Sequence, residues 1–252
     1  MDNYYIPQDN HLTRFVQLHG GEDEIALTLE PDSRLDLYCV EQEGGRRTVT
    51  VNLRERAALN LVVLTLHEGE SHLRLHVKLL GEGAKVSLNG AVIGSGAMKS
   101  EQDLLVEHCV PGCTSTMLFK QVLGEDSNGY LSGRVLVDSG AQQTASEQTF
   151  ASLLTSPMAR AQTLPQLEIY ADDVKCNHGA TVGKLDEAAL FYMRQRGIPE
   201  AEACLLLQHA FVGDVLQHIT DEAHRARFTA LVEQKFRGQI SRCNVCKTPC
   251  KQ

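Results

Sequence analysis

The sequence predicts a mainly β protein, in which an all-β domain is followed by a small α-helical segment. Between about residues 24 and 170, short runs of alternating polar and apolar residues are separated by breaks that contain glycine or acidic residues. A period of two is typical of strands that bury one face. From residue 184 onward the apolar spacing changes to that of amphipathic helices, with a period of 3.6.

Eight runs in the first region have the strand period. The clearest is HLRLHVKLL at 72–80, where leucine and valine alternate with histidine, arginine and lysine. The others cover 34–40, 48–53, 59–66, 84–94, 103–110, 115–124 and 130–137. Many short strands with no helical pattern between them indicate an all-β domain. On this pattern alone a sandwich, a barrel and a β-solenoid all remain open, and the lack of a strict sequence repeat weakens the solenoid.

Three helices are expected in the C-terminal segment. Asp186 is a candidate N-cap for a first helix of about eleven residues, with Gly197 just past its end. Pro199 opens a second helix at the favoured first position, and Asp221 can cap a third that ends near Gly238. The second helix carries an apolar stripe of Leu207, Phe211, Val215 and Ile219. From sequence alone we expect this stripe to be core rather than a docking surface.

The expected organisation is a lead-in at 1–23, the β domain at 24–183, the helical segment at 184–240 and a cysteine-rich tail at 241–252. The formal charge is −8, from 24 basic and 32 acidic residues, and the basic residues form no stripe. This argues against a nucleic-acid partner. The most apolar run, 57–66, is too short to span a membrane, and the N-terminus lacks the pattern of a secretory signal. We therefore expect a cytoplasmic protein whose thiols are reduced.

The tail contains one candidate metal site. Cys243, Cys246 and Cys250 form a C-x₂-C-x₃-C array, a spacing at which thiolates chelate zinc or an iron–sulfur cluster. A closed tetrahedral site needs a fourth ligand, from elsewhere in the chain or from a second subunit. The alternative is a mobile tail that merely carries thiols, and the two interpretations stand level.

A second candidate lies in the stretch IYADDVKCNHGATVG at 169–183. In an extended backbone, Cys176 and His178 project to the same side with Cα atoms about 6.5–7 Å apart. That spacing allows them to ligate one metal or to share a proton. The alternative is a strand-to-helix turn, with Gly179 and Gly183 supplying backbone freedom. The chemistry of these residues alone favours neither the ligand pair nor the turn. Phosphate-binding, nucleophile-elbow and zinc-protease motifs are all missing from the chain.

The run from 164 to 211 closely resembles the C-terminal core of the SufB/SufD family of iron–sulfur cluster assembly proteins. The matching motifs are ADDVKCNHGATVG, the following D-E-x-A-L-F-Y at 186–192 and R-x-R-G-I at 194–198. EHCVPGCTS and GRVLVDSGAQQTASEQ are weaker matches, so the resemblance covers roughly residues 100–220. The chain is similar to the SufD branch. The SufB branch has a glutamate after the histidine, where this chain has Gly179, and a sulfur-accepting cysteine that the corresponding stretch 149–156 lacks.

The resemblance implies a right-handed parallel β-helix with helical C-terminal elements. It also implies a non-catalytic scaffold with two partners, a SufB-like subunit and a SufC-type ABC ATPase. Cys176 and His178 would face the SufB-like subunit as ligands of iron or of a transient, shared iron–sulfur cluster, or as a proton and sulfur relay, and 169–183 would be a strand-to-helix turn at that edge. The ATPase would dock on the C-terminal helices, for which the matching positions are Phe191, Tyr192, Arg194, Arg196, Leu207 and Phe211.

The chain departs from the family in two ways. It has almost nothing ahead of the β region, where an N-terminal helical domain is usual, and the cysteine-rich tail is not part of the family pattern. Parts of the sequence are compatible with two other functions. An independent β-solenoid hydrolase or lyase needs paired acids on one face, but the adjacent Asp172 and Asp173 point to opposite faces of a strand. A self-contained metal- or cluster-binding homodimer would use Cys243, Cys246 and Cys250.

Overall fold

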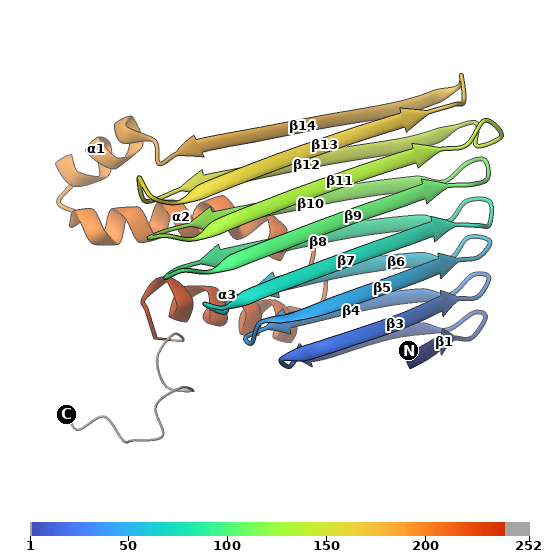
Figure 1. Cartoon of the computed structure of the whole chain (residues 1–252), viewed down its shortest axis with the longest axis horizontal. Helices are drawn as coiled ribbons and strands as arrows, with labels where there is room; N and C mark the ends of the chain where they lie inside the picture. The colour runs from blue at the N-terminus through green and yellow to red at the C-terminus, as the bar shows by residue number, and fades with distance from the viewer. Residues whose placement is uncertain (1, 240–252) are drawn as a thin grey trace.

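The structure, a computed structural model, describes residues 2–239 and contains two parallel sheets joined into a β-solenoid, with three helices on one side (Figure 1). The odd sheet consists of β1 (Asp2–Ile6), β3 (Gly21–Leu29), β5 (Gly45–Leu53), β7 (Glu70–Leu79), β9 (Lys99–His108), β11 (Asn128–Val137) and β13 (Arg160–Ile169). The even sheet consists of β2 (His11–Leu18), β4 (Arg34–Glu41), β6 (Ala58–Thr65), β8 (Lys85–Gly94), β10 (Thr114–Leu123), β12 (Thr144–Leu154) and β14 (Val174–Lys184). The expected parallel β-helix is therefore confirmed, and the sandwich and the barrel are ruled out.

Strand pairing skips one strand at each step: β10, for example, pairs in parallel with β8 and β12. Each turn of the solenoid thus adds one strand to each sheet. The strands β1 and β2 lie within the region 1–23 that the sequence analysis sets apart as a lead-in, so the solenoid includes this region.

The turns that lead into β2, β4, β6, β8 and β10 share a left-handed residue two positions before the strand. The residues are Asp9, Asp32, Arg56, Gly83 and Gly112, with φ between 53° and 71°. Successive turns also bond to each other: the Asp32 backbone N–H donates to Glu55 O at 2.9 Å, and Arg56 Nε donates to Asp32 Oδ1 at 2.6 Å. A structural repeat therefore exists although the residue at the repeated position changes. That variation explains why the sequence shows no strict repeat.

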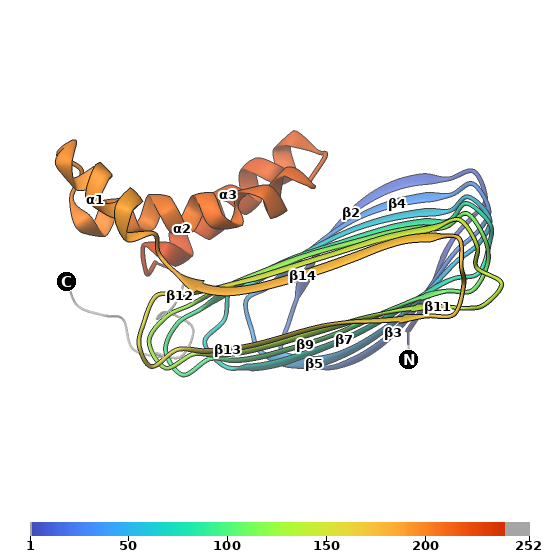
Figure 2. The ribbon, with the colours of Figure 1, turned by 90° about the horizontal axis from the view of Figure 1, so that it is seen from above.

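Apolar side chains from both sheets fill the interior, which is seen end-on in Figure 2. On β7, Leu75, Val77 and Leu79 are buried inside, while His76 and Lys78 lie on the outer face. This is the alternation that the sequence predicts for 72–80. Two aromatic rings fill the interior further along: Phe119 and Phe150 are in register on β10 and β12, with their rings edge-to-face at 6.2 Å.

The helices begin close to where their caps predict. In α1 (Glu187–Gln195), the Asp186 side chain accepts hydrogen bonds from the N–H groups of the first turn, and Gly197 follows with φ +82°. In α3 (Glu222–Phe236), Asp221 caps the first turn. Pro199 is the N-cap of α2 (Glu200–Gln217) and not its first residue, so this helix begins one residue later than expected. No helix in the described part of the chain is long and apolar enough to cross a membrane.

Helices α2 and α3 pack against the outer face of the even sheet, on one side of the solenoid in Figure 2. Val215, Ile219 and Phe228 are fully buried in this contact. Polar contacts fix the helices further: the Tyr38 hydroxyl accepts a hydrogen bond from Thr220 N at 3.1 Å, and Lys120 Nζ is 2.5 Å from Asp214 Oδ2. The apolar stripe of α2 is thus core at its C-terminal half, as expected, while Leu207 and Phe211 are half-buried.

The interior aromatic residues predict a sharp steric constraint. A Cβ added to Gly133 would lie 2.3 Å from Phe150 Cζ, so the Gly133→Ala variant must displace a ring in a filled interior. We expect a loss of about 1–3 kcal/mol in the free energy of unfolding, which urea denaturation measures. Gly179→Ala is the control, because a Cβ there meets nothing within 4 Å. Equal stability of the two variants would contradict this account of the interior.

Candidate functional site

Most of the stretch 169–183 is a strand, and it is not the expected strand-to-helix turn. Residues 170–173 form the bend after β13, and 174–184 form β14, which pairs in continuous register with β12. Gly179 and Gly183 have no left-handed φ and lie within this strand. β14 is the last strand of the even sheet, and its outer edge has no partner within residues 2–239. The candidate site therefore sits at the open end of the solenoid.

Cys176 and His178 project from the same face of β14, as their spacing predicts. Cys176 is half-buried and packs against the apolar core of the interior. His178 is exposed, and its side chain has no hydrogen bond or ion pair within the described chain. In register beneath them on β12 lie Ser146 and Gln148, which are both buried. Cys176 and His178 thus lie at the mouth of the interior. The buried polar side chains of Ser146 and Gln148 form a polar floor beneath them.

The floor continues inward as a hydrogen-bonded chain. The hydroxyl oxygens of Ser146 and Ser115 are 2.8 Å apart, and Ser115 Oγ is 2.9 Å from His108 Nε2. Thr144 Oγ1 donates its single proton to the carbonyl of Ala141 at 2.8 Å. It must therefore accept from His108 Nδ1, which lies 3.5 Å away, so Nε2 accepts from Ser115. Burial lowers the pKa of His108 to about 4 and keeps this ring neutral.

Burial also raises the pKa of the Cys176 thiol, and a hydrogen bond from the Ser146 backbone N–H opposes this effect in part. Cys176 therefore carries its proton at neutral pH, and a metal ion would have to displace that proton. One thiol and one imidazole fit soft or borderline metals, but they supply two ligands only. No group of three or more metal-ligating side chains occurs within 2–239. Any further ligands of a metal at this site would have to come from outside residues 2–239.

The site does not include Asp172, Asp173, His72 or His76. Asp172 and Asp173 lie in the exposed bend before β14, and not on a strand. His72 and His76 lie on the outer face of the odd sheet, where His72 Nε2 is 3.3 Å from Asp103 Oδ2 and His76 pairs with a glutamate. Each of these two histidines thus has a carboxylate partner on the outer face.

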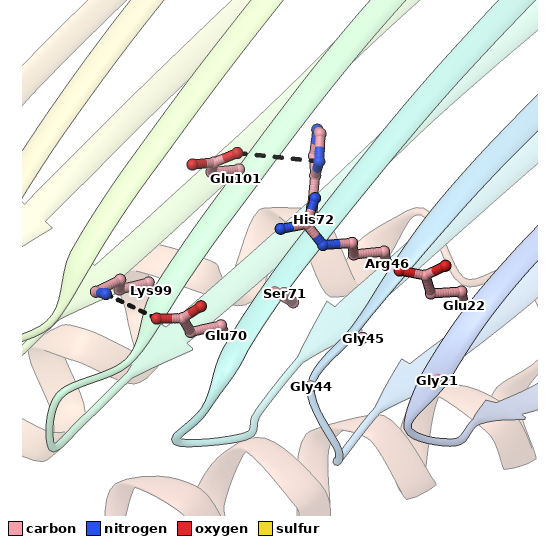
Figure 3. A pocket seen from close by; sticks show the side chains of 10 residues that line it. All are labelled: Gly21, Glu22, Gly44, Gly45, Arg46, Glu70, Ser71, His72, Lys99 and Glu101. Atoms are coloured by element: carbon pink, nitrogen blue, oxygen red, sulfur yellow. Dashed lines mark hydrogen bonds and ion pairs between the residues drawn. The ribbon is translucent and has the colours of Figure 1, made fainter.

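A charged hollow of about 650 Å³ opens on the same outer face (Figure 3). Its lining residues are Gly21, Glu22, Gly44, Gly45, Arg46, Glu70, Ser71, His72, Lys99 and Glu101. Two of its side chains have a carboxylate partner: Lys99 Nζ is 2.7 Å from Glu70 Oε1, and His72 Nδ1 is 3.9 Å from Glu101 Oε2. Because the lining is mostly polar and no apolar wall holds a ligand, the hollow is a weaker candidate than the mouth of the interior.

The expected docking positions fall into two groups. Phe191 and Tyr192 on α1 are 62% and 60% exposed, and the Arg196 guanidinium lies over the Tyr192 ring at 5.2 Å. Arg194, on the same helix, is 3.3 Å from the Glu200 carboxylate. In contrast, Leu207 and Phe211 belong to α2, and Phe211 packs on the solenoid beneath Lys120 Nζ. Cys243, Cys246 and Cys250 lie outside the described residues.

Sequence reasoning found Cys176 and His178 but missed the floor beneath them. Ser146 and Gln148 occupy inward positions of β12, four and two residues before the buried Phe150. Polar residues at inward positions of a buried strand were the available signal, since they need internal partners. This signal can be used only after 144–154 has been recognised as a strand. The alternating runs that identify the other strands in the sequence end before this segment.

These features define a class: a parallel β-solenoid whose last strand presents a thiol and an imidazole at an open edge. The family model for the SUF system FeS cluster assembly SufBD core domain matches residues 18–211. The chain therefore belongs to the SufBD family. It is 32% identical over 161 residues to the iron–sulfur cluster assembly protein SufD of Escherichia coli, an alignment that covers 64% of this chain and 38% of that protein.

Two further relatives support the same family assignment. A SufBD family protein of Mycobacterium bovis is 32% identical over 188 residues, covering 71% of this chain and 47% of the relative. SufD of Bacillus subtilis is 26% identical over 172 residues, covering 68% and 39%. The chain thus spans less than half the length of these curated relatives. The match supports the SufD-like resemblance that the motifs indicated.

The buried His108 predicts a dependence of stability on pH. Its folded pKa of about 4 lies below the ordinary value of 6.5, so the unfolded chain binds more protons between these values. Stability should therefore fall as the pH drops from 6.5 towards 4, by about 3 kcal/mol for this one group. In urea denaturation, His108→Asn should lower stability at pH 7 but flatten the decline. An equally steep decline in the variant would contradict a neutral buried His108.

Proposed function

We propose that this chain is a SufD-type scaffold subunit in iron–sulfur cluster assembly, and that the open end of its solenoid faces a SufB-like subunit. Family membership supports the process, and one observation carries the assignment of the surface. The unpaired β14 edge brings Cys176 and His178 to the mouth of the interior, where no other part of residues 2–239 covers them. Iron or a nascent cluster is the cargo at this site.

The chemistry of β14 supports pairing with another chain. An unpaired strand presents a row of free N–H and C=O groups, and soluble proteins normally cover or shorten such edges. β14 is eleven residues long, and all its residues from Asn177 to Lys184 are exposed. Gly179 and Gly183 leave room for a close approach of a second backbone. Pairing at this edge would continue the even sheet into the partner.

The two donors support a shared site. Cys176 and His178 supply a soft and a borderline ligand on one face, and two ligands leave coordination positions for a partner's side chains or for the cargo itself. The protonated Cys176 thiol loses its proton when it binds a cation. In this role the chain positions ligands and catalyses no reaction by itself.

The exposed aromatic residues of α1 support a separate docking surface for a SufC-type ABC ATPase. Phe191 and Tyr192 are not used in packing the helices on the solenoid, because α1 has no buried residue. Arg194 and Arg196 flank them, which gives an aromatic and basic surface of the kind found in interface hot spots. Leu207 and Phe211 would support this surface from α2. No observation favours the alternative, a homodimer that holds metal through Cys243, Cys246 and Cys250.

The β14 edge is tested by a charged substitution. Gly179→Lys adds a lysine to the open edge, where a side chain meets nothing within 4 Å, so the fold should be kept. Because lysine on an edge strand opposes pairing, we expect at least a roughly 10-fold loss of affinity for the SufB-like chain of the same genome, measured by titration calorimetry.

Gly69→Lys is the matched control, because it adds the same charge to an exposed turn between β6 and β7. It should bind like the unchanged protein. If Gly179→Lys also bound like the unchanged protein, pairing at β14 would be wrong.

The α1 surface is tested by truncating its aromatic side chains. The Phe191→Ala, Tyr192→Ala double variant should reduce capture of the SufC-type ATPase roughly 10-fold or more without lowering the thermal midpoint, because both side chains are largely exposed. Tyr4→Ala removes an aromatic residue of similar exposure at the opposite end of the solenoid and should have no effect. Normal ATPase capture by the double variant would reject this docking surface.

A further inference from the structure

We propose that Gln148 is a positioning residue for the site at the end of the solenoid: its side-chain carbonyl accepts the ring N–H of His178 when His178 binds a metal cation. The inference rests on the proposed function, because it assumes that His178 is a ligand. It assigns a role to a buried group on β12 that lies below the ligand pair and not within it.

The first observation is the register. Gln148 on β12 pairs with His178 on β14, and Ser146 pairs with Cys176. Neighbouring parallel strands are about 4.8 Å apart, so in-register side chains on the same face stack on each other. Gln148 is therefore the residue directly beneath His178.

The second observation is the direction of the Gln148 side chain. Its Nε2 donates to the backbone carbonyl of Gln166 at 3.4 Å, and Gln166 lies on β13, in the last turn of the solenoid. The Gln148 amide thus reaches from its own turn towards the turn that holds His178. The contact also fixes the amide orientation, because only the NH₂ group can donate to a carbonyl.

The third observation is an unused acceptor. Gln148 is 1% exposed, and its Oε1 has no hydrogen-bond partner. A buried acceptor without a donor costs free energy, because it has lost its hydrogen bond to water and gained none. His178 above it has an imidazole that is equally without a partner in the described chain. The Gln148 carbonyl oxygen lacks a donor, and the His178 ring can provide an N–H.

Metal chemistry explains why the two would meet. A histidine that binds a metal through one ring nitrogen almost always donates the N–H of the other to a carbonyl, a carboxylate or water, which fixes the tautomer and the ring orientation. If His178 turns towards the mouth beside Cys176, the Gln148 carbonyl is the buried acceptor beneath it. The exposed ring would then become a fixed ligand.

The test uses the full chain with Cys243, Cys246 and Cys250 replaced by serine, so that Cys176 dominates the thiolate signal. The probe is Co²⁺ alone, followed anaerobically by the thiolate-to-cobalt absorption that Cys176→Ser and His178→Ala should remove or weaken. Gln148→Met keeps the length of the side chain and removes the acceptor. It should weaken Co²⁺ binding roughly 10- to 100-fold, and Gln148→Glu, which keeps an acceptor, should restore most of the affinity.

Gln121→Met is the matched control. Gln121 is also 1% exposed and also has an Oε1 without a partner, but it stacks beneath Ser152 and not beneath His178. Its variant should therefore bind Co²⁺ like the parent. Unchanged affinity in Gln148→Met, or an equal loss in Gln121→Met, would overturn the inference while leaving Cys176 and His178 as ligands. If the parent shows no signal that depends on Cys176, the ligand role fails and the inference fails with it.

A second measurement needs no variant at Gln148. With Cd²⁺ bound to the ¹⁵N-histidine-labelled parent, one His178 ring N–H should exchange slowly with water, because a buried carbonyl holds it. His178→Ala identifies the signal. Exchange as fast as that of a free imidazole would overturn the proposed contact even if Gln148→Met failed to fold.

Discussion

The structure depends on one constraint: parallel strands stack in register, so every inward side chain lies on its counterpart in the turn below. Backbone groups and side chains in the middle of the stack find partners on both sides. The last strand, β14, has a neighbouring strand on one side only. The free edge and the positions of Cys176 and His178 are both consequences of ending a regular stack at that point.

The same constraint explains how the interior is divided. Apolar residues and the Phe119–Phe150 pair fill most of it, and a polar section with His108, Ser115 and Ser146 leads to the open end. A polar group inside such a stack must bond to a neighbour in an adjacent turn. The hydrogen bond between Ser115 and Ser146 therefore links adjacent turns, and Gln148, one strand from the open end, keeps an acceptor without a partner.

Much of the fold follows from the sequence, for reasons that individual residues make plain. The alternation at 72–80 and the change of period at 184 give the two classes of element, and the caps Asp186 and Asp221 place two helices. The solenoid itself came from resemblance, because the repeated left-handed turn position is aspartate, arginine or glycine in different turns. β14 was misassigned as a turn, since Gly179 and Gly183 are typical turn residues and every residue of the strand from Asn177 onward is exposed. The position of Gln148 beneath His178 follows from the strand register, which no local sequence pattern reveals.

Hydrogen exchange of the β14 backbone amides most directly tests whether this open edge is the working surface. In the isolated chain, the amides of 174–184 that point away from β12 should exchange quickly, because they have no partner. On addition of the SufB-like chain, the account predicts strong protection of these amides, while the β1 edge at the other end of the solenoid stays unprotected. A stable complex in which β14 exchanges as fast as in the free chain would contradict it.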